Sequence, residues 1–374
     1  MFERPSRGDR ALLVELDLGE GRVSDRLAEL AALAASAGAT VAGTVTGRRQ
    51  RPDAATYAGK GKVEEIAGLR RTGGADLVIF DHPLSGVQQR NLEQALGCRV
   101  VDRTSLILDI FAQRARSSEG KLQVELAQLK HMATRLVGGW THLERQKGGI
   151  GLRGPGETQL ETDRRLIAKR VKALTTRLAG VARSRATQGR TRRRAAVRTV
   201  ALVGYTNAGK STLFNRLTGA RVEAMDQLFA TLDTTLRRIH VSGAGTVVLS
   251  DTVGFIRELP HDLVAAFRAT LAEATEADLL LHVIDASAPD RDDQVAAVEA
   301  VLAEIGADAI PQIRVLNKCD RADLATGVTR DPCGTICAVC VSALTGAGCN
   351  ELRDALSERL TSETAAPPTI SLPA

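Results

Sequence analysis

The chain is poor in aromatic residues and has no long apolar run. Phe, Trp and Tyr make up 3% of its 374 residues, against 44% hydrophobic residues in all. We therefore expect cores built mainly from Ala, Leu and Val, and no ring platforms for stacking single-stranded nucleic acid. The lack of any run of 18 apolar residues predicts no membrane span. Because residues 1–7 lack the apolar stretch of a secretory signal, we expect a cytoplasmic protein.

Cysteine is also scarce, with six in the chain. Cys333, Cys337 and Cys340 lie close enough in the sequence to suggest a metal site, but no histidine or second Cys-x-x-Cys pair is near them. The run 336–341 fits a buried strand better, because cysteine packs there as a small apolar residue. We do not expect disulfides in a cytosolic protein.

One segment has no acidic residues. Residues 164–198 hold eleven Arg and two Lys, so they carry +13 and leave −7 for the rest of a chain whose net charge is +6. A block of this kind is typical of an RNA-binding surface. The scarcity of rings favours recognition of backbone and shape in folded RNA. The alternative is a solvated, partly disordered linker, above all across 183–194.

The sequence does contain a phosphate-binding loop, at residues 204–212. It lies between the β-prone run 200–203 and an apolar pattern typical of a helix, which is the context that such a loop needs. Backbone N–H groups and the helix dipole then favour bound phosphates. We expect Lys210 to reach the β- and γ-phosphates and the Ser211 hydroxyl to bind Mg²⁺. The loop residues are Gly204, Tyr205, Thr206, Asn207, Ala208, Gly209, Lys210, Ser211 and Thr212.

A second motif, further along the chain, indicates guanine. The Asp320 carboxylate can accept from both N1–H and the exocyclic amine of guanine, whereas adenine would leave this charge unpaired. We expect Asn317 to tie this loop to the phosphate loop, the stem of Lys318 to cover the base, and the backbone of 342–344 to meet the guanine O6. The residues of the two elements are Asn317, Lys318, Cys319, Asp320, Ser342, Ala343 and Leu344.

Two shorter elements lie between these motifs. Asp251 is expected to hold Mg²⁺ through water, and the Gly254 N–H to contact the γ-phosphate. Thr231 is the favoured second hydroxyl ligand of Mg²⁺, with Thr234 and Thr235 as alternatives. The first element comprises Phe229, Ala230, Thr231, Leu232 and Asp233, and the second comprises Asp251, Thr252, Val253 and Gly254.

The usual catalytic glutamine is missing. Phe255 follows Asp-x-x-Gly at the position where many GTPases place the Gln that orients the attacking water. Because phenylalanine cannot bind water, we expect slow intrinsic hydrolysis that depends on an activator. The candidate catalytic residues are Lys210, Thr231 and Asn207. GTPases that use K⁺ in place of an arginine finger carry Asn at the position of Asn207; the alternative is that Asn207 only shapes the loop.

The patterns predict an α/β protein, with a P-loop GTPase domain preceded by an α/β domain and a long antiparallel helical hairpin. The expected parts are an N-terminal domain at 1–115, the hairpin at 116–196, the GTPase domain at 197–362 and a disordered tail at 363–374. In the first part we expect strands at 11–18, 40–46, 76–81 and 99–101, and helices at 24–37, 61–72 and 85–96.

The expected hairpin pairs helices at 117–137 and 160–178, the second with an apolar side formed by Leu166, Val171, Leu174 and Leu178. A glycine-rich basic loop joins them and carries the only Trp of the chain. A loop of this length is rarely mere connection. We interpret it as a probe that orders on RNA, the alternative being a disordered tip. The candidate rRNA contacts are Arg145, Lys147, Arg153, Arg164, Arg165 and Arg170.

A smaller glycine-lysine loop, residues 57–62, precedes an expected helix of the N-terminal domain. It could hold a phosphate or an RNA backbone. Because it lacks the full spacing of a phosphate loop, an ordinary helix-entry loop is the favoured interpretation.

In this order the motifs resemble the HflX-type GTPases, which are related to translation factors. The resemblance covers about residues 10–360. It rests on the segments 57–62, 148–165, 204–212, 229–233, 251–255 and 259–263. It implies a ribosome-associated GTPase that binds GTP and GDP and contacts rRNA of the large subunit near the peptidyl-transferase region. We expect the protein to be a monomer. Such proteins split or rescue stalled ribosomes, and ribosome-stimulated GTP hydrolysis resets them.

The resemblance also implies ATP as a minor ligand of the N-terminal domain, near Gly59. Two features depart from the family pattern: Thr234 stands where a proline is usual, and the Pro-rich stretch 365–374 stands where some relatives have a further domain. Two other function classes stay open. One is an RNA-binding assembly module in which GTP only orders the protein, and the other is an ATP-dependent RNA remodeller centred on 1–115.

Overall fold

A computed structural model of the chain describes residues 8–19, 21–136, 155–194, 197–220, 227–257 and 268–362. It forms two compact units, 1–179 and 180–374. Both are α/β, which confirms the predicted fold class. None of the described helices is both long and apolar enough to cross a bilayer.

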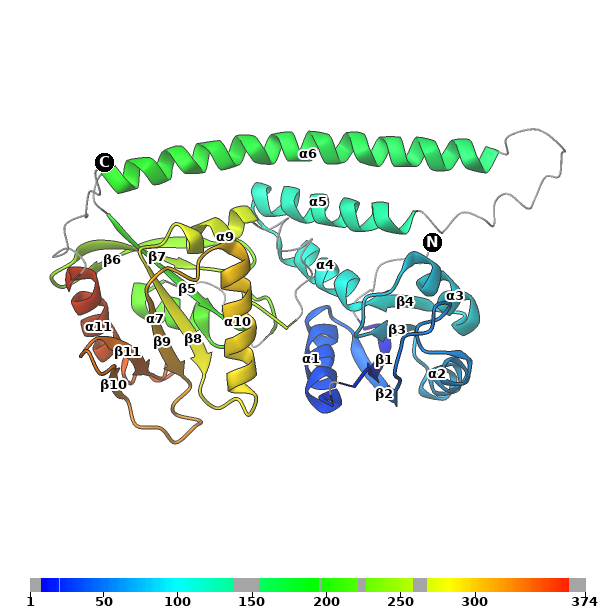
Figure 1. Cartoon of the computed structure of the whole chain (residues 1–374), viewed down its shortest axis with the longest axis horizontal. Coiled ribbons are helices and arrows are strands. Elements are labelled where there is room, and N and C mark those ends of the chain that lie inside the picture. The colour runs from blue at the N-terminus through cyan, green and yellow to red at the C-terminus, as the bar shows by residue number, and fades with distance from the viewer. Residues whose placement is uncertain are drawn as a thin grey trace, which may run out of the picture. The chain divides into compact units, whose positions relative to one another are not determined.

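The first unit is built on a parallel sheet in the order β2-β1-β3-β4. Its strands are β1 (Arg10–Asp17), β2 (Thr40–Arg48), β3 (Leu77–Phe80) and β4 (Arg99–Asp102). Its first four helices are α1 (Val23–Ser36), α2 (Lys60–Gly73), α3 (Gly86–Leu96) and α4 (Arg103–Arg114). Helices α1 and α4 cover one face of the sheet and α2 and α3 the other (Figure 1). Apolar side chains buried on the sheet's central strands form the core.

All seven elements predicted for residues 1–115 occur, with ends shifted by a few residues. Helix α4 is the element that the sequence patterns missed. It begins directly after β4, with no turn residue between them, because Asp102 ends the strand and also caps the helix. The Asp102 carboxylate accepts from the Ser105 N–H at 2.9 Å, which satisfies a backbone donor of the first turn.

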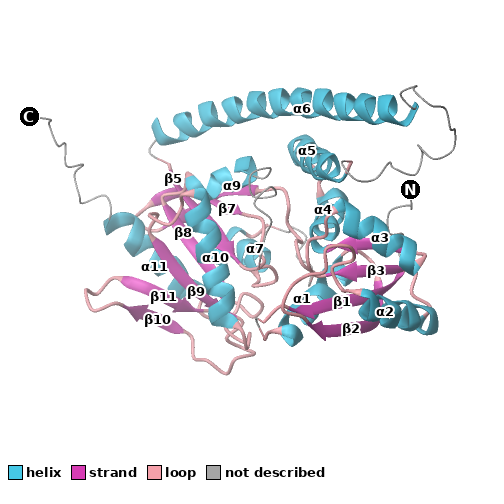
Figure 2. Ribbon diagram, turned by 45° about the vertical axis from the view of Figure 1, so that its right-hand side comes forward, coloured by secondary structure: helices cyan, strands magenta, loops and turns pink. Residues whose placement is uncertain are grey.

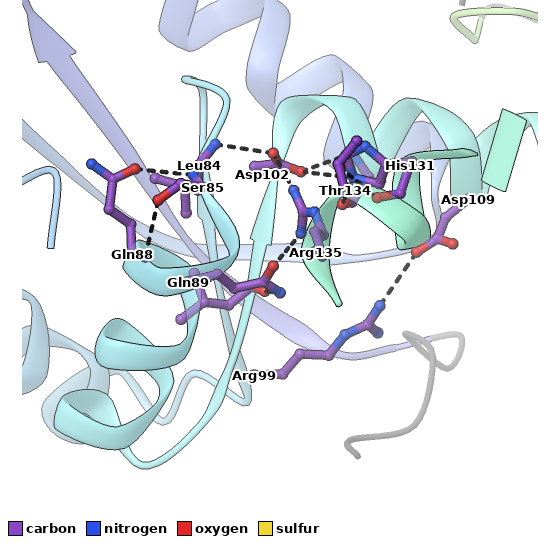
Figure 3. Close-up of polar contacts among 12 residues, drawn as sticks. Leu84, Ser85, Gln88, Gln89, Arg99, Asp102, Asp109, His131, Thr134 and Arg135 are labelled. Carbon is purple, nitrogen blue, oxygen red and sulfur yellow. Dashed lines mark hydrogen bonds and ion pairs between the residues drawn. The ribbon is translucent and has the colours of Figure 1, made fainter. Parts of the chain in front are cut away.

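Asp102 also attaches the next helix, α5 (Ser118–Arg135), to this sheet. Figure 3 shows its carboxylate between the Leu84 N–H, at 3.1 Å, and the Arg135 guanidinium, at 2.6 Å. Arg135 donates as well to Gln89 on α3. A Cβ on Gly86 would lie 3.0 Å from the Arg135 carbonyl oxygen, so α3 and α5 meet backbone to backbone. The C-terminal end of α5 is therefore fixed to the sheet edge by a buried carboxylate.

Changing Asp102 to Asn should lower the free energy of unfolding by about 2 kcal/mol, since it weakens a buried ion pair whose arginine can still reach water. Urea unfolding, followed by a probe in the first unit, measures this. Asp109→Asn is the matched control, because Asp109 pairs with Arg99 at 3.4 Å nearer the surface (Figure 3). We expect at most about 0.5 kcal/mol for the control. Equal losses in the two variants would show that Asp102 has no special part in attaching α5.

Helix α6 (Pro155–Arg194) is a single helix of 40 residues, much longer than the predicted 160–178. It continues through the basic stretch 183–194, which is therefore helical and not disordered. Leu174 is buried, but Leu166 is 56% exposed, so its predicted place on the apolar side is wrong too. Leu166 lies about 80° around the helix from Leu174, which turns it to solvent. Arg170 pairs with Glu125 of α5 at 2.6 Å.

The second unit contains a seven-stranded sheet in the order β10-β11-β9-β8-β5-β7-β6. Only β10 and β6, at its two edges, run antiparallel to their neighbours. The strands are β5 (Arg198–Gly204), β6 (Thr235–Val241), β7 (Gly245–Asp251), β8 (Leu279–Asp285), β9 (Gln312–Asn317), β10 (Gly327–Arg330) and β11 (Ile336–Cys340). The helices are α7 (Lys210–Thr218), α9 (Arg268–Thr275), α10 (Arg291–Ile305) and α11 (Cys349–Ser362).

Helices cover both faces of this sheet (Figure 2). Helices α7 and α11 contribute Phe214, Leu217, Leu352 and Leu356 to the main core under one face. Helices α9 and α10 pack on β5 and β8. Because β5, β7, β8 and β9 are parallel, their carboxyl ends meet at one edge, where open α/β sheets place their ligand sites.

Candidate functional site

The phosphate loop joins β5 to α7 at this edge and lines a pocket that is open to solvent. Figure 1 shows both elements in the second unit. The pocket also receives the predicted segment around Thr231 and the backbone at Gly254. Its lining residues are Thr206, Asn207, Gly209, Lys210, Ser211, Thr212, Gln227, Phe229, Ala230, Thr231, Thr252 and Gly254. The structure thus gathers the loop and both shorter motifs at one cavity.

Both the backbone conformation of Gly209 and the space around it require glycine. Its φ is +92°, and a Cβ there would lie 2.3 Å from the Asn317 amide nitrogen. This nitrogen donates to the Ala208 carbonyl at 2.8 Å, and the Asn317 side-chain oxygen accepts from the Ala343 N–H at 2.9 Å. Asn317 therefore ties the phosphate loop to the two elements that are predicted to recognise the base.

The ammonium of Lys210 is buried within the loop. It donates to the carbonyls of Gly204, at 3.0 Å, and Tyr205, at 2.7 Å. Burial lowers the pKa of Lys210 to about 8, although the nearby Asp251 carboxylate opposes this shift. The loop thus holds a cation that is poorly solvated and ready to pair with an anion.

Three oxygen-bearing side chains converge beside Lys210. The Ser211 and Thr231 hydroxyls lie 2.8 Å apart, and each also bonds the same Asp251 carboxylate oxygen, at 2.7 and 3.0 Å. Burial raises the pKa of Asp251, against the opposing effects of the Ser211 bond and Lys210. Its other carboxylate oxygen has no hydrogen-bond partner among the described residues. Hard oxygen donors with an unsatisfied buried carboxylate match the preferences of Mg²⁺.

The two alternatives to Thr231 lie elsewhere. Thr235 is the first residue of β6, where it pairs with Asp251 through the strand backbone, and Thr234 precedes that strand. It is the Thr231 hydroxyl that bonds both Ser211 and Asp251.

Phe255 is pinned to the phosphate loop through its backbone. Its N–H donates to the Gly204 carbonyl at 3.1 Å, and its carbonyl accepts from the Thr206 N–H at 2.7 Å. The ring is 1% exposed, so this position presents no polar side chain to the pocket. A Cβ on the preceding Gly254 would come 3.1 Å from the Lys210 ammonium nitrogen, which places that backbone directly at the cation.

The base-recognition loop is partly braced by residues that the sequence analysis missed. Lys318 donates to Asp285, at the end of β8, at 2.6 Å. Burial acts to raise the pKa of Asp285, but the bonds from Lys318 and Ser287 outweigh it and the pKa is lowered. Asp320 is exposed at the surface of this loop, and Cys319 is buried beneath it.

Arg216 and Gln227 were missed as well. Arg216, on α7, donates to the carbonyls of Ala343 and Leu344, and Gln227 lines the pocket. Asp285 could have been suspected from its place at the end of an apolar run. Arg216 and Gln227 carry no local signal in the sequence.

The remaining predicted contacts give a mixed result. Arg145, Lys147 and Arg153 lie outside the described residues. Arg164 and Arg165 are exposed on α6, whereas Arg170 is engaged with Glu125.

In the N-terminal loop, the Lys62 ammonium bonds the Thr46 carbonyl at 2.9 Å and Glu65 at 2.7 Å. The Gly59 N–H donates to the Thr56 hydroxyl at 3.1 Å. These groups serve an ordinary helix entry, and they lend no support to ATP at this loop.

The six cysteines are free thiols in the structure. The predicted strand occurs as β11, but its core side chains are Ile336 and Val339. Cys337 and Cys340 are half-buried and Cys333 is exposed, so the expectation that these cysteines pack in the core is wrong. The described residues contain no group of three or more His, Cys, Asp or Glu side chains placed to hold a metal ion.

Three family descriptions match successive parts of the chain. Residues 24–112 match "GTP-binding GTPase N-terminal", residues 114–193 match "GTP-binding GTPase Middle Region", and residues 199–318 match "50S ribosome-binding GTPase". The matches follow the order of the motifs described above.

Curated relatives match almost the whole chain. The protein named GTPase HflX from Escherichia coli is 56% identical over 366 residues, which are 98% of this chain and 86% of that protein. A GTPase HflX from Caldanaerobacter subterraneus is 49% identical over 357 residues, 95% of this chain and 82% of that protein. Among solved structures, SsGBP in complex with GDP has a TM-score of 0.52 at 24% identity, covering 96% of this chain and all of that one. The last likeness supports the fold alone.

Proposed function

The chain belongs to the HflX family of GTPases and is a GTP-hydrolysing enzyme, and we propose that it works on the large ribosomal subunit, where it binds rRNA and splits or rescues stalled ribosomes. In this proposal the ribosome stimulates hydrolysis, and the protein acts in the cytoplasm. The support for a ribosomal partner is the family description that residues 199–318 match.

The burial of the Phe255 ring is the observation from which we infer that hydrolysis needs an activator. The pocket has a cation, a hydroxyl pair and a buried carboxylate, but a buried ring stands where a water-orienting amide is usual. The pocket therefore has the groups needed to bind phosphates, but it has no side chain at this position that could orient the attacking water. A partner surface that supplies or orders this group would therefore raise the rate of hydrolysis.

We assign roles to the pocket residues accordingly. Ser211 and Thr231 are the hydroxyls that would hold Mg²⁺, with Asp251 behind them. Mg²⁺ would neutralise charge on the phosphates during transfer. The Lys210 ammonium exchanges its bonds with the loop carbonyls for bonds with phosphate, and Asp320 reads the guanine edge.

Asn207 is proposed to favour K⁺ as a second cation. It has a left-handed backbone, with φ +59°, and it lines the phosphate end of the pocket. An amide oxygen at this place suits a monovalent cation next to the phosphates. Rates of hydrolysis in K⁺ and in Na⁺ test this role, and equal rates in the two salts would rule it out.

The docking surface is proposed to be the basic face of α6. Arg164 and Arg165 are exposed there, in a stretch with no acidic residue as far as 198. Contacts of arginine with rRNA phosphates release counterions, so binding should weaken steeply as salt is raised.

Purified large subunits at low salt should raise the rate of GTP hydrolysis at least about tenfold, since a missing water-positioning group is worth about that much or more. Arg164→Glu with Arg165→Glu should remove most of this stimulation and leave the basal rate unchanged. Arg237→Glu with Arg238→Glu, two exposed positions of the edge strand β6, makes the same charge change elsewhere and should keep the stimulation. If large subunits fail to stimulate the unaltered protein at low salt, the ribosomal proposal is wrong.

A further inference from the structure

The loop 342–347 has one backbone donor to spare. Five of its six N–H groups have acceptors within the protein. The N–H of Ser342 donates to the Ala347 carbonyl and that of Ala343 to Asn317 Oδ1. The N–H groups of Thr345, Gly346 and Ala347 donate to Ser342 Oγ, the Ser342 carbonyl and Thr345 Oγ1 in turn. Within this described loop, the Leu344 N–H is the amide with no protein partner. Ser342 is fully buried and anchors the turn, so this amide is presented by a rigid frame.

Arg216 controls how that amide points. Its Nε donates to the Ala343 carbonyl at 3.2 Å, and its Nη2 donates to the Leu344 carbonyl. The Ala343 carbonyl and the Leu344 N–H belong to one trans peptide, so they point in opposite directions. Holding the carbonyl toward α7 turns the N–H away from α7.

The guanidinium also packs on the loop. A Cβ on Gly346 would lie 3.5 Å from the Arg216 Cζ, so the planar group rests against the Gly346 backbone. Two carbonyl bonds from one edge of the guanidinium, together with this flat contact, require the fork of an arginine, because a lysine ammonium would bind as a single point.

We propose that Arg216 is a positioning residue for base specificity, which orients the Leu344 N–H toward the 6-oxo group of the purine. This inference rests on the proposed reading of guanine by Asp320 and by the backbone of 342–344, and it adds the side chain that sets how this backbone points. Asp320 tests the N1 and 2-amino positions, and the braced amide tests position 6. A 6-amino purine would place its amino group, a hydrogen-bond donor, against the Leu344 N–H, which is also a donor, so both groups would stay unpaired.

The arrangement also gives α7 two tasks. Its first turn carries Lys210 and Ser211 at the phosphates, and its last turn carries Arg216 at the base loop. One rigid helix therefore sets the distance between phosphate and base recognition. The two residues that meet at the base loop, Arg216 and Ala343, are separated by 127 residues along the chain.

The test compares affinities of the full chain for GDP, 6-thio-GDP and ADP. The first two ligands differ only at position 6, where sulfur is a weak acceptor. The unaltered protein should prefer GDP to 6-thio-GDP by about tenfold. Arg216→Ala should weaken GDP by about that factor and 6-thio-GDP much less, so that the preference nearly disappears. Arg216→Lys should fall between the two.

Arg353→Ala is the matched control, because Arg353 donates to the Leu217 carbonyl beside the same helix end without touching the base loop. It should keep the preference for GDP over 6-thio-GDP. If Arg216→Ala weakens both ligands equally, or neither, Arg216 has no part in reading position 6. A separate failure would be equal binding of ADP and GDP by the unaltered protein, which would remove the guanine assignment of Asp320 itself.

Discussion

Replacing Gly209 with alanine should reduce affinity for guanine nucleotides on the order of a thousandfold. The new Cβ would sit 2.3 Å from the Asn317 amide nitrogen, so the side chain must move. Asn317 is 2% exposed and bonds both Ala208 and Ala343, and moving it leaves buried polar groups unpaired. Two lost bonds of about 2 kcal/mol each correspond to this factor. The phosphate loop and both parts of the base site would be disturbed by one methyl group.

The cost of the backbone conformation must be separated from the clash. Gly219 caps the end of the same helix with φ +68°, and a Cβ there would meet nothing within 4 Å. Gly219→Ala therefore carries a similar left-handed strain, of about 1 kcal/mol in stability, and should leave nucleotide affinity unchanged.

Isothermal titration with GDP, alongside thermal unfolding of the nucleotide-free protein, distinguishes the two effects. We expect Gly209→Ala to lose binding and to unfold at a lower temperature than Gly219→Ala, since its clash also unpairs the buried Asn317 side chain. Affinities for GDP that agree within a few fold between the two variants would show that Asn317 can rearrange at little cost.

How far the sequence predicts this protein depends on how local each feature is. The strand β3 was expected at 76–81 and occurs at Leu77–Phe80, because a short apolar run between acidic residues has few alternatives. Helix α4 escaped prediction since Asp102 serves as strand end and helix cap at once, and no turn residue marks the boundary. Leu166 was misplaced because its residue type indicates burial, while its angle around α6 faces solvent.

The site shows the same division. The phosphate loop is a local motif, and six of its nine residues line the pocket together, as expected of a contiguous stretch. Asp285 and Arg216 are common residue types whose partners are 33 and 127 residues away, so only the folded chain reveals them. Asn317 was placed correctly because its motif carries the long-range information that a single residue lacks.

Lys210→Met should lower GTP hydrolysis about a thousandfold, because it removes the charge that stabilises the phosphates while nearly keeping the side-chain volume. Single-turnover hydrolysis at saturating GTP measures the loss. The same substitution should not destabilise the nucleotide-free protein. Methionine suits a buried, apolar stem, whereas the lysine ammonium is taken out of water with only loop carbonyls and Asp251 to compensate it.

The lowered pKa of Lys210 also predicts whether the free energy of unfolding rises or falls with pH. Burial lowers the pKa of Lys210 from 10.5 to about 8 in the folded, nucleotide-free protein. Between these values the unfolded chain binds more protons than the folded one, so the free energy of unfolding rises with pH. Below pH 8 the folded state carries the full cost of the buried charge, about 3 kcal/mol, and above 10.5 this cost is gone.

Urea unfolding of the unaltered protein and of Lys210→Met, from pH 7 to pH 10, isolates this contribution as the difference between them. The variant should be the more stable at pH 7, and its advantage should shrink as pH rises above 8. Bound phosphate favours the charged lysine, so GDP affinity of the unaltered protein should fall by up to about tenfold per pH unit above 8. A stability difference that is constant with pH would mean that Lys210 is well solvated in the free protein. The lowered pKa thus reflects the free energy that the folded protein loses by burying the Lys210 ammonium. The loop keeps this ammonium charged at neutral pH although little solvent reaches it, and the bound nucleotide supplies the anionic partner.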